Sequence, residues 1–248
     1  MIRVETDDGI RIMHMEFGAA NALGPTSVAA LVDEFKRERV PTVITGEGNI
    51  FSAGLNLVET ATLDREEMAA FVEDFSILMT LALTTRYPLV AAVNGHAVAG
   101  GCVLAMACDH RVGTEGPFKI GMNEMAIGLT LPAVVTEILR GKLTPDKART
   151  VILGGALYAP DDAVGEGLLD ETTADHATTV ARAVAIARQL GKAPAGFAAM
   201  KGSLVAPITE RLQHTRAALD IRFIESWFGD TATALRNDVV ARLTDAKS

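Results

Sequence analysis

The chain has 248 residues, and its 23 Lys and Arg against 31 Asp and Glu give a formal net charge of −8. Hydrophobic residues make up 49% and charged residues 22%, globular proportions that exclude a disordered or collagen-like chain. A chain of this length has room for one sizeable core. The acidic balance argues against nucleic-acid binding, which needs clustered cations, and at first against any polyanionic ligand.

Cysteine usage and hydropathy favour a soluble chain in a reducing compartment. Cys102 and Cys108 are the two cysteines, and their spacing fits neither a disulfide framework nor a zinc site, so we expect buried thiols. Residues 1–17 alternate polar and apolar side chains and lack the apolar stretch of a signal peptide. No run of roughly 18 uninterrupted apolar residues occurs, and we expect no membrane span and a cytoplasmic location.

Strand and helix patterns alternate over the first two thirds of the chain, which predicts an α/β core with covered sheets. Segments 2–6 and 11–17 alternate around Asp7-Asp8-Gly9, which predicts a hairpin with a positive φ at Gly9. The elements expected next are, in chain order, a helix from Pro25, a buried strand Pro41–Thr45, a loop Gly46–Gly54, a helix capped by Asp64 or Thr62 and ending near Tyr87, a buried strand Pro88–Val93, turns at Asn94-Gly95 and Ala99–Gly101, an apolar helix Gly101–Ala107, and strands Asp109–Val112 and Phe118–Ile120.

The last third is expected to be almost purely helical. Its predicted helices are Pro132–Arg140, Pro145–Leu153, Pro160–Glu166, Asp175–Gly191 and, after a break at Pro194-Ala195-Gly196, a strong stretch Thr209–Thr244. One stripe of this stretch carries many of the large aromatic residues: Leu219, Phe223, Ile224, Trp227 and Phe228. The stripe could pack on the chain's own core or on another subunit, and we favour the subunit.

Two glycine-bearing loops follow buried strands and could carry chemistry. They are Phe51–Leu57 (FSAGLNL) and Asn94–Cys102 (NGHAVAGGC), and neither forms a P-loop or a dinucleotide fingerprint. Small residues leave backbone N–H groups accessible, and the second loop opens a helix, whose N-terminus favours negative charge. Two such N–H groups could hold one developing oxyanion, although tight packing of the loops on a sheet is the alternative interpretation.

Glu124 is a single acid within the nearly apolar stretch Gly121–Leu129. Desolvation there would raise the pKa of its carboxyl group and suit it to act as a base near neutral pH. The alternative is an ordinary glutamate in a surface loop.

Together these segments resemble the crotonase (enoyl-CoA hydratase/isomerase) superfamily over essentially the whole chain. FSAGLNL is similar to the family's F-S/A-A-G-x-D-L loop, and PLVAAVNGHAVAGGCVLAMACDHRV is similar to its second, glycine-rich block. The resemblance implies an α/β fold of the ββα spiral type, with a spiral acyl-CoA-binding core over residues 1–192 and a C-terminal helical oligomerisation region over residues 193–248. It also implies a homotrimer or hexamer, an acyl-CoA thioester substrate, and no metal or other cofactor, since CoA belongs to the substrate.

The resemblance also assigns site residues. The two oxyanion amides would be those of Leu55 and Gly100, and the acid would be Glu124. The expected substrate-binding residues are Ala53, Gly54, Leu55, Asn56, Leu57, Gly100 and Asn123. Asn56 stands where the family usually has Asp, which leaves the role of this side chain open.

Val103 decides which reaction we expect. Hydratases of the family carry a first glutamate at this position and a second at the position of Glu124, whereas moving a double bond from C3 to C2 needs one carboxylate and an oxyanion hole. The local sequence, with Asn123 before Glu124, is more similar to the Δ3,Δ2-enoyl-CoA isomerases of fatty acid β-oxidation. The alternatives are an enoyl-CoA hydratase, another enolate-forming reaction (a hydrolase or lyase), and a catalytically silent acyl-CoA binder.

Because CoA carries phosphates, the acidic net charge can no longer be taken as evidence against a polyanionic ligand. A few local cations could meet the CoA phosphates despite the acidic balance. Lys192, Lys201, Arg211 and Arg222 are the candidates in the C-terminal third.

Overall fold

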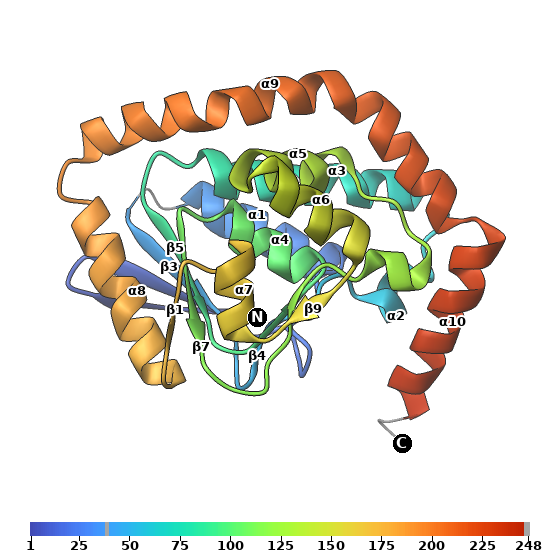
Figure 1. Cartoon of the computed structure of the whole chain (residues 1–248), viewed down its shortest axis with the longest axis horizontal. Coiled ribbons are helices and arrows are strands. Elements are labelled where there is room, and N and C mark those ends of the chain that lie inside the picture. The colour runs from blue at the N-terminus through green and yellow to red at the C-terminus, as the bar shows by residue number, and fades with distance from the viewer. Residues whose placement is uncertain (38–39, 246–248) are drawn as a thin grey trace.

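The computed structural model describes residues 1–37 and 40–245, which form two sheets and a set of covering helices (Figure 1). The strands are β1 Ile2–Asp7, β2 Ile10–Met15, β3 Thr42–Thr45, β4 Ile50–Ser52, β5 Leu89–Val93, β6 His96–Val98, β7 His110–Thr114, β8 Ile120–Gly121, β9 Leu157–Tyr158 and β10 Glu171–Thr173. The helices are α1 Pro25–Arg37, α2 Leu57–Thr60, α3 Arg65–Thr84, α4 Gly100–Ala107, the 3-10 turn η1 Glu124–Ile127, α5 Ala133–Lys142, α6 Pro145–Gly154, α7 Pro160–Glu166, α8 His176–Leu190, α9 Pro194–Trp227 and α10 Asp230–Asp245.

The strands within the described residues form two sheets, one of six strands and one of four. The larger has the order β1-β2-β3-β5-β7-β10, in which every neighbouring pair but β1–β2 is parallel. The smaller has the order β4-β6-β8-β9, in which β4, β6 and β8 run parallel and β9 antiparallel. The expected hairpin is confirmed, with Asp8 at φ 46° and Gly9 at φ 78° between β1 and β2. The α/β fold class is confirmed as well.

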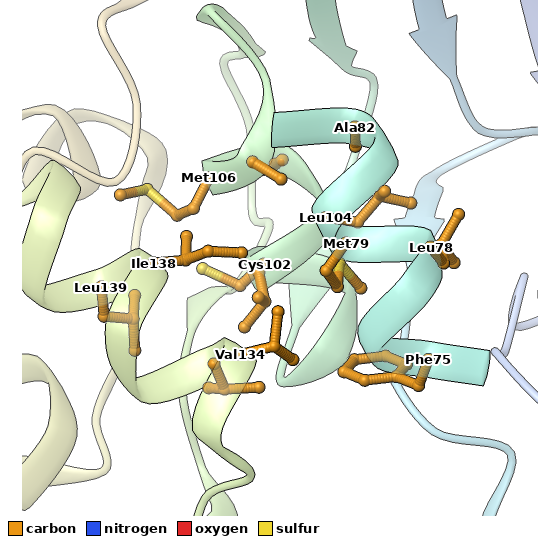
Figure 2. Packing of buried hydrophobic residues seen from close by; sticks show 14 of the residues in the cluster. Phe75, Leu78, Met79, Ala82, Cys102, Leu104, Met106, Val134, Ile138 and Leu139 are labelled. Atoms are coloured by element: carbon orange, nitrogen blue, oxygen red, sulfur yellow. The ribbon is translucent and has the colours of Figure 1, made fainter. Parts of the chain in front are cut away.

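The main core forms where α3, α4 and α5 meet (Figure 2). All eight residues of α4 are buried, as expected for a helix that is apolar on every side. Leu104 and Met106 of α4 lie in one cluster with Phe75 and Met79 of α3 and with Ile138 of α5. Both cysteines are buried and unpaired, as expected, and burial raises the pKa of each thiol to about 12.

Two expectations for the chain's shorter elements are wrong. The predicted loop Gly46–Gly54 contains β4, and β6 follows the turn at Asn94-Gly95. Each strand has only three residues, too few for a periodic pattern, and depends on a partner over forty residues away in the chain: Ile50 pairs with His96. The same shortness hides β9 and β10.

The expected break at Pro194-Ala195-Gly196 is also wrong. These residues form the first turn of α9, where a proline needs no hydrogen-bond donor, and the interruption lies just before them, at residues 191–193. The predicted helical stretch Thr209–Thr244 comprises the end of α9 and most of α10, which Phe228-Gly229 separates. At 34 residues, α9 crosses the molecule along one side for about 50 Å (Figure 1).

The aromatic stripe of α9 packs on the chain's own core. Phe223 is 2% exposed and Trp227 is fully buried, and Leu219, Ile224 and Phe228 pack against the same cluster. The favoured interpretation as a subunit surface is therefore wrong for this stripe, because the interior of the same chain accounts for it.

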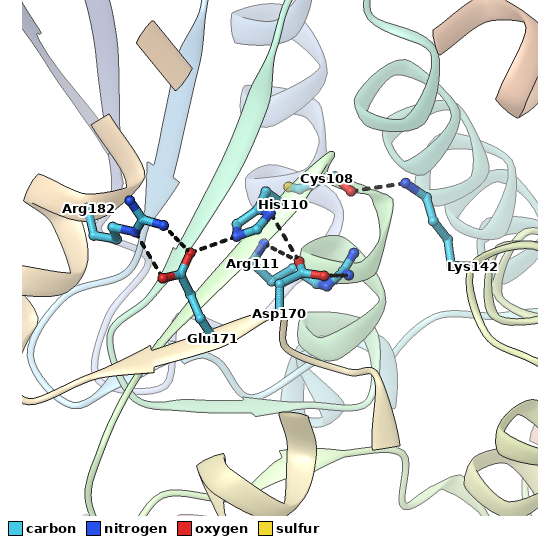
Figure 3. Close-up of polar contacts among 7 residues, drawn as sticks. All are labelled: Cys108, His110, Arg111, Lys142, Asp170, Glu171 and Arg182. Carbon is cyan, nitrogen blue, oxygen red and sulfur yellow. Dashed lines mark hydrogen bonds and ion pairs between the residues drawn. The ribbon is translucent and has the colours of Figure 1, made fainter. Parts of the chain in front are cut away.

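Polar pairs fasten β10 and α8 to the larger sheet (Figure 3). Arg111 of β7 donates from Nη2 to Asp170 Oδ1 over 2.6 Å, and its backbone N–H donates to Oδ2 over 2.8 Å. Next to it, Glu171 lies 3.0 Å from His110 Nε2 and accepts from Arg182 Nε of α8 over 2.9 Å. These charges sit at the sheet's edge and pair with one another.

A buried ion pair attaches α9 to the core. Lys201 Nζ lies 2.8 Å from Asp109 Oδ1, and the two side chains are 6% and 11% exposed. Asp109 also accepts a hydrogen bond from the Leu89 N–H. Close by, Lys142 of α5 donates to the Cys108 carbonyl oxygen (Figure 3). Asp109 is therefore shared by α9 and by the start of β5.

We predict that Lys201→Met lowers the free energy of unfolding by about 3 kcal/mol, because it leaves the Asp109 carboxylate buried without its cation. Urea unfolding would measure this. The control is Lys192→Met at an exposed lysine just before α9, which should change stability by less than about 0.5 kcal/mol. Equal stability of the two variants would contradict the anchoring role of Lys201.

Candidate active site

The three segments singled out in the sequence follow three neighbouring parallel strands. Residues 53–57 follow β4, residues 99–101 follow β6, and residues 122–124 follow β8. The carboxyl ends of parallel strands meet at one edge of a sheet, so these segments converge on one place. The smaller sheet thereby brings together parts of the chain that lie about seventy residues apart in sequence.

Two turns of backbone come unusually close at this edge. Gly54 has φ 84°, and a Cβ added there would lie 2.7 Å from the Val98 carbonyl oxygen and 3.0 Å from the Gly100 nitrogen. Ala99, the N-cap of α4, also has a positive φ of 52°, a strained conformation for a residue with a side chain. Glycine at position 54 therefore allows the chain just before Leu55 to approach the Val98–Gly100 turn closely.

Those two amides are left without acceptors in the part of the chain that the structure describes. Leu23 forms a parallel bridge with Leu55, in which it donates to the Gly54 carbonyl oxygen and accepts from the Asn56 N–H. In such a bridge the central residue's own N–H points to the opposite side. Gly100 is the first residue of α4, where N–H groups have no partner within the helix. Both residues line the same pocket.

Glu124 opens η1 at the wall of this pocket. The residue as a whole is half-buried, yet its Oε2 is shielded from solvent and has no hydrogen-bond partner among the described residues. Burial raises the pKa of the carboxyl group to about 7, and the backbone amides of Glu124 and Asn123 offset part of the rise. A group with this pKa can both take and return a proton near neutral pH.

The pocket has a volume of about 300 Å³, and its wall is largely apolar. Among the described residues that line it, Glu124 is the one with an ionisable side chain. It also receives side chains that the sequence analysis did not assign to the site: Ala20, Ala22, Val58, Phe71, Val72, Phe75, Ala99, Ile127, Leu129, Pro132, Val135, Phe223 and Val239. Most of these are ordinary apolar helix residues, so no local sequence signal distinguishes them from core.

The structure brings most of the predicted site residues together. Ala53, Leu55, Asn56, Leu57, Gly100, Asn123 and Glu124 all line the pocket. Gly54 does not, because it is buried against Val98–Gly100 and shapes the backbone instead. The Asn56 side chain caps α2 by accepting from the Glu59 N–H over 3.3 Å, and Asn56 Nδ2 donates to Glu59 Oε2 over 3.0 Å. The side chain of Asn56 therefore has a structural task.

Val103 does not add a second carboxyl group to the pocket. It is fully buried within α4, belongs to the main core cluster and does not line the pocket. Among the described residues, the pocket therefore presents one carboxyl group beside two unpaired amides.

Two of the four cations predicted to meet the CoA phosphates form ion pairs within the chain. Lys201 is the wrong choice, because it is buried in its ion pair with Asp109. Arg211 donates from Nε to the buried carboxylate of Glu137 over 2.8 Å and so ties α9 to α5. Lys192 and Arg222 are exposed. Lys192 precedes the end of α9 that lies beside α8, whereas α10 and α2 lie at the other end (Figure 1).

Comparison with known proteins places this site in a family. The profile of the enoyl-CoA hydratase/isomerase family matches residues 5–233. The chain belongs to this family, the crotonase family, and has its α/β fold. Within the described residues, no helix is long and apolar enough to cross a bilayer.

Relatives of both reaction types are similar to the chain. Mouse mitochondrial enoyl-CoA delta isomerase 1 is 28% identical over 178 residues, which are 69% of this chain and 62% of the relative. The structure of human mitochondrial delta3-delta2-enoyl-CoA isomerase superposes with a TM-score of 0.92 at 24% identity, covering 100% of this chain and 99% of the other. An enoyl-CoA hydratase from Mycobacterium ulcerans superposes with a TM-score of 0.81 at 29% identity, covering 92% and 99% of the two chains.

We predict that Glu124→Gln changes stability in a pH-dependent way. Because the pKa of Glu124 is raised from 4.5 to about 7, ionisation costs the folded state free energy that the unfolded state does not lose. Wild-type stability should therefore fall relative to the variant as pH rises from 4.5 to 7. The difference should reach roughly 3 kcal/mol above pH 7 and vanish below pH 4.5.

Chemical unfolding of both proteins between pH 4 and pH 8 measures this difference. Glu115→Gln, at an exposed glutamate between β7 and β8, is the matched control for the loss of one carboxyl group. A constant difference across the range would mean that Glu124 titrates normally.

Proposed function

We propose that the chain is a Δ3,Δ2-enoyl-CoA isomerase that moves a C3 double bond of an acyl-CoA thioester to C2. One observation carries the proposal: among the described residues, the pocket has a single carboxyl group, Glu124, beside two unpaired backbone amides. The resemblance to the family places Val103 at the position of the hydratases' first glutamate, and this residue is buried and apolar. The apolar wall suits a hydrocarbon chain. The expected setting is the β-oxidation of unsaturated fatty acids.

In the proposed reaction Glu124 begins ionised and takes a proton from C2. The electron pair of that C–H bond delocalises into the thioester carbonyl, whose oxygen accepts hydrogen bonds from the N–H groups of Leu55 and Gly100. The double bond then shifts from C3=C4 to C2=C3 as the same carboxylic acid returns the proton to C4. Bonds and charge balance, and no cofactor takes part. Asn123 would contact the substrate or orient the loop.

Hydration is the competing function, because hydratases are among the similar proteins. Addition of water must activate the water and deliver a proton to C2, which one carboxylate does less well than two. The buried, apolar position of Val103 supports the isomerase. Homotrimers or hexamers and a cytoplasmic location stay predictions of the sequence.

We predict that Glu124→Gln lowers kcat for isomerisation of 3-hexenoyl-CoA at least about 10²-fold, because the base is lost. Binding of a saturated acyl-CoA should stay close to that of the wild type. For the wild type, kcat/KM should rise with pH and level off above about 7, because Glu124 must start deprotonated.

The ultraviolet absorbance of the conjugated product measures isomerisation, and loss of crotonyl-CoA absorbance measures hydration. Near-native turnover in the Glu124→Gln variant would remove Glu124 from the mechanism. Faster hydration than isomerisation by the wild type would favour a hydratase, and tight binding without any turnover would favour a silent binder.

We predict that Gly54→Ala lowers kcat by about 10²-fold or more while the protein still folds, because the added Cβ pushes the Val98–Gly100 turn away and separates the two amides. The control is Gly165→Ala in α7, where an added Cβ meets nothing within 4 Å. Kinetics with 3-hexenoyl-CoA, alongside the melting temperature of each variant, would check this. Full activity of Gly54→Ala would show that the close approach of the two turns is not needed.

A further inference from the structure

The last helix lies against two segments that belong to the site. Helix α10 contacts η1, which begins with Glu124, and α2, which follows Leu55 and Asn56. A Cβ added at Gly128, at the end of η1, would lie 3.6 Å from both Thr231 Cγ2 and Leu235 Cδ1 of α10. Val239 of α10 lines the pocket itself. The helix is thus one wall of the site.

Little apolar burial holds α10 in this position. Between residues 230 and 242, the buried residues are Ala232, 2% exposed, and Arg236, 5% exposed. With Val239 they are spaced at four and three residues, which puts all three on one face of the helix. Because alanine buries little surface, Arg236 is the larger of the two buried side chains that attach this part of α10.

Arg236 makes two contacts, both with Trp227 at the end of α9. Its Nη1 donates to the Trp227 carbonyl oxygen over 2.7 Å, and its guanidinium carbon lies 4.4 Å from the centroid of the indole ring. The first contact places a cation at a helix C-terminus, and the second places it on the face of an aromatic ring. Trp227 is itself fully buried and packs against Phe223, which lines the pocket.

Within the residues that the structure describes, Arg236 is buried without the carboxylate partner that usually accompanies a buried arginine. It forms no ion pair with a carboxylate in the described part of the chain, and its Nε is buried without a partner. Burial lowers the pKa of the guanidinium group, with no acid to offset the cost. Burying a cation without an ion-pair partner costs free energy, and the two contacts with Trp227 are the interactions that offset this cost.

We propose that Arg236 is a positioning residue whose two contacts with Trp227 hold α10 over η1 and α2, and so set how tightly the apolar part of a bound acyl chain is enclosed. Only the identity of the ligand rests on the proposed function. The attachment of α10 itself stands on contacts within the chain.

Trp227 is the single tryptophan of the chain, so its fluorescence reports directly on this contact. The variants are Arg236→Met, which keeps an apolar stem, and Arg236→Lys, which keeps the charge and a donor. The control is Arg242→Met at an exposed arginine on the same helix. Three measurements on the full chain are acrylamide quenching of Trp227, hydrogen exchange of the α10 amides, and binding of decanoyl-CoA and butanoyl-CoA.

For Arg236→Met we expect quenching to rise about two-fold or more and exchange to rise about ten-fold within α10 and not in the core helices. Decanoyl-CoA should bind about ten-fold more weakly, and butanoyl-CoA should lose less, because fewer of its methylene groups meet the wall. Arg236→Lys should fall between wild type and Arg236→Met, which keeps the test open if Arg236→Met does not fold. Arg242→Met should resemble the wild type.

Unchanged quenching and exchange in both Arg236 variants would overturn the proposal, as would exchange that rises equally in every helix. Equal weakening for both acyl chains would overturn the enclosure of the acyl chain. If the wild type binds neither acyl-CoA, the proposed function fails, while quenching and exchange still decide whether Arg236 holds α10.

Discussion

The close approach of two backbone turns, at Gly54 and at Val98–Gly100, is the constraint on which the rest of the site depends. Hydrogen-bond donors from two distant loops can serve one oxygen atom only if no side chain separates them. The molecule meets this condition with a glycine at φ 84° on one turn and a strained Ala99 on the other. The buried helix α4 then fixes the second turn, because all of its residues pack in the main core.

The site's charge distribution follows from the same arrangement. Ion pairs lie at the edge of the larger sheet and at the helix junctions, where cations and carboxylates satisfy one another. Among the described residues, the pocket is left with one acid, Glu124, whose buried Oε2 has no hydrogen-bond partner. A carboxyl group so placed is a weaker acid and a stronger base than in water, which is what proton transfer at carbon requires.

The sequence predicted the loops of the site better than its walls. Glu124 and the two glycine-bearing loops interrupt an apolar pattern, which can be recognised locally. The choice of the Leu55 and Gly100 amides within those loops came from the resemblance to the crotonase family. Phe75, Phe223 and Val239 carry no such signal, because an apolar residue at helical spacing looks the same whether it faces a pocket or the core. The short strands β4 and β6 were not predicted for a related reason, because they are defined by pairing with a distant segment and not by local periodicity. The aromatic stripe of α9 was misjudged because sequence alone does not show that α9 folds back over its own core.

The order in which the pocket is assembled has a consequence during synthesis. Its lining begins at Ala20 and ends at Val239, so a ribosome must have made the segments before α10 before the last wall exists. Until α10 emerges, a growing chain whose core has already formed leaves the apolar interior of the site open to water and to other chains. Any form of the chain in which α10 is not yet in place therefore exposes the apolar wall of the pocket.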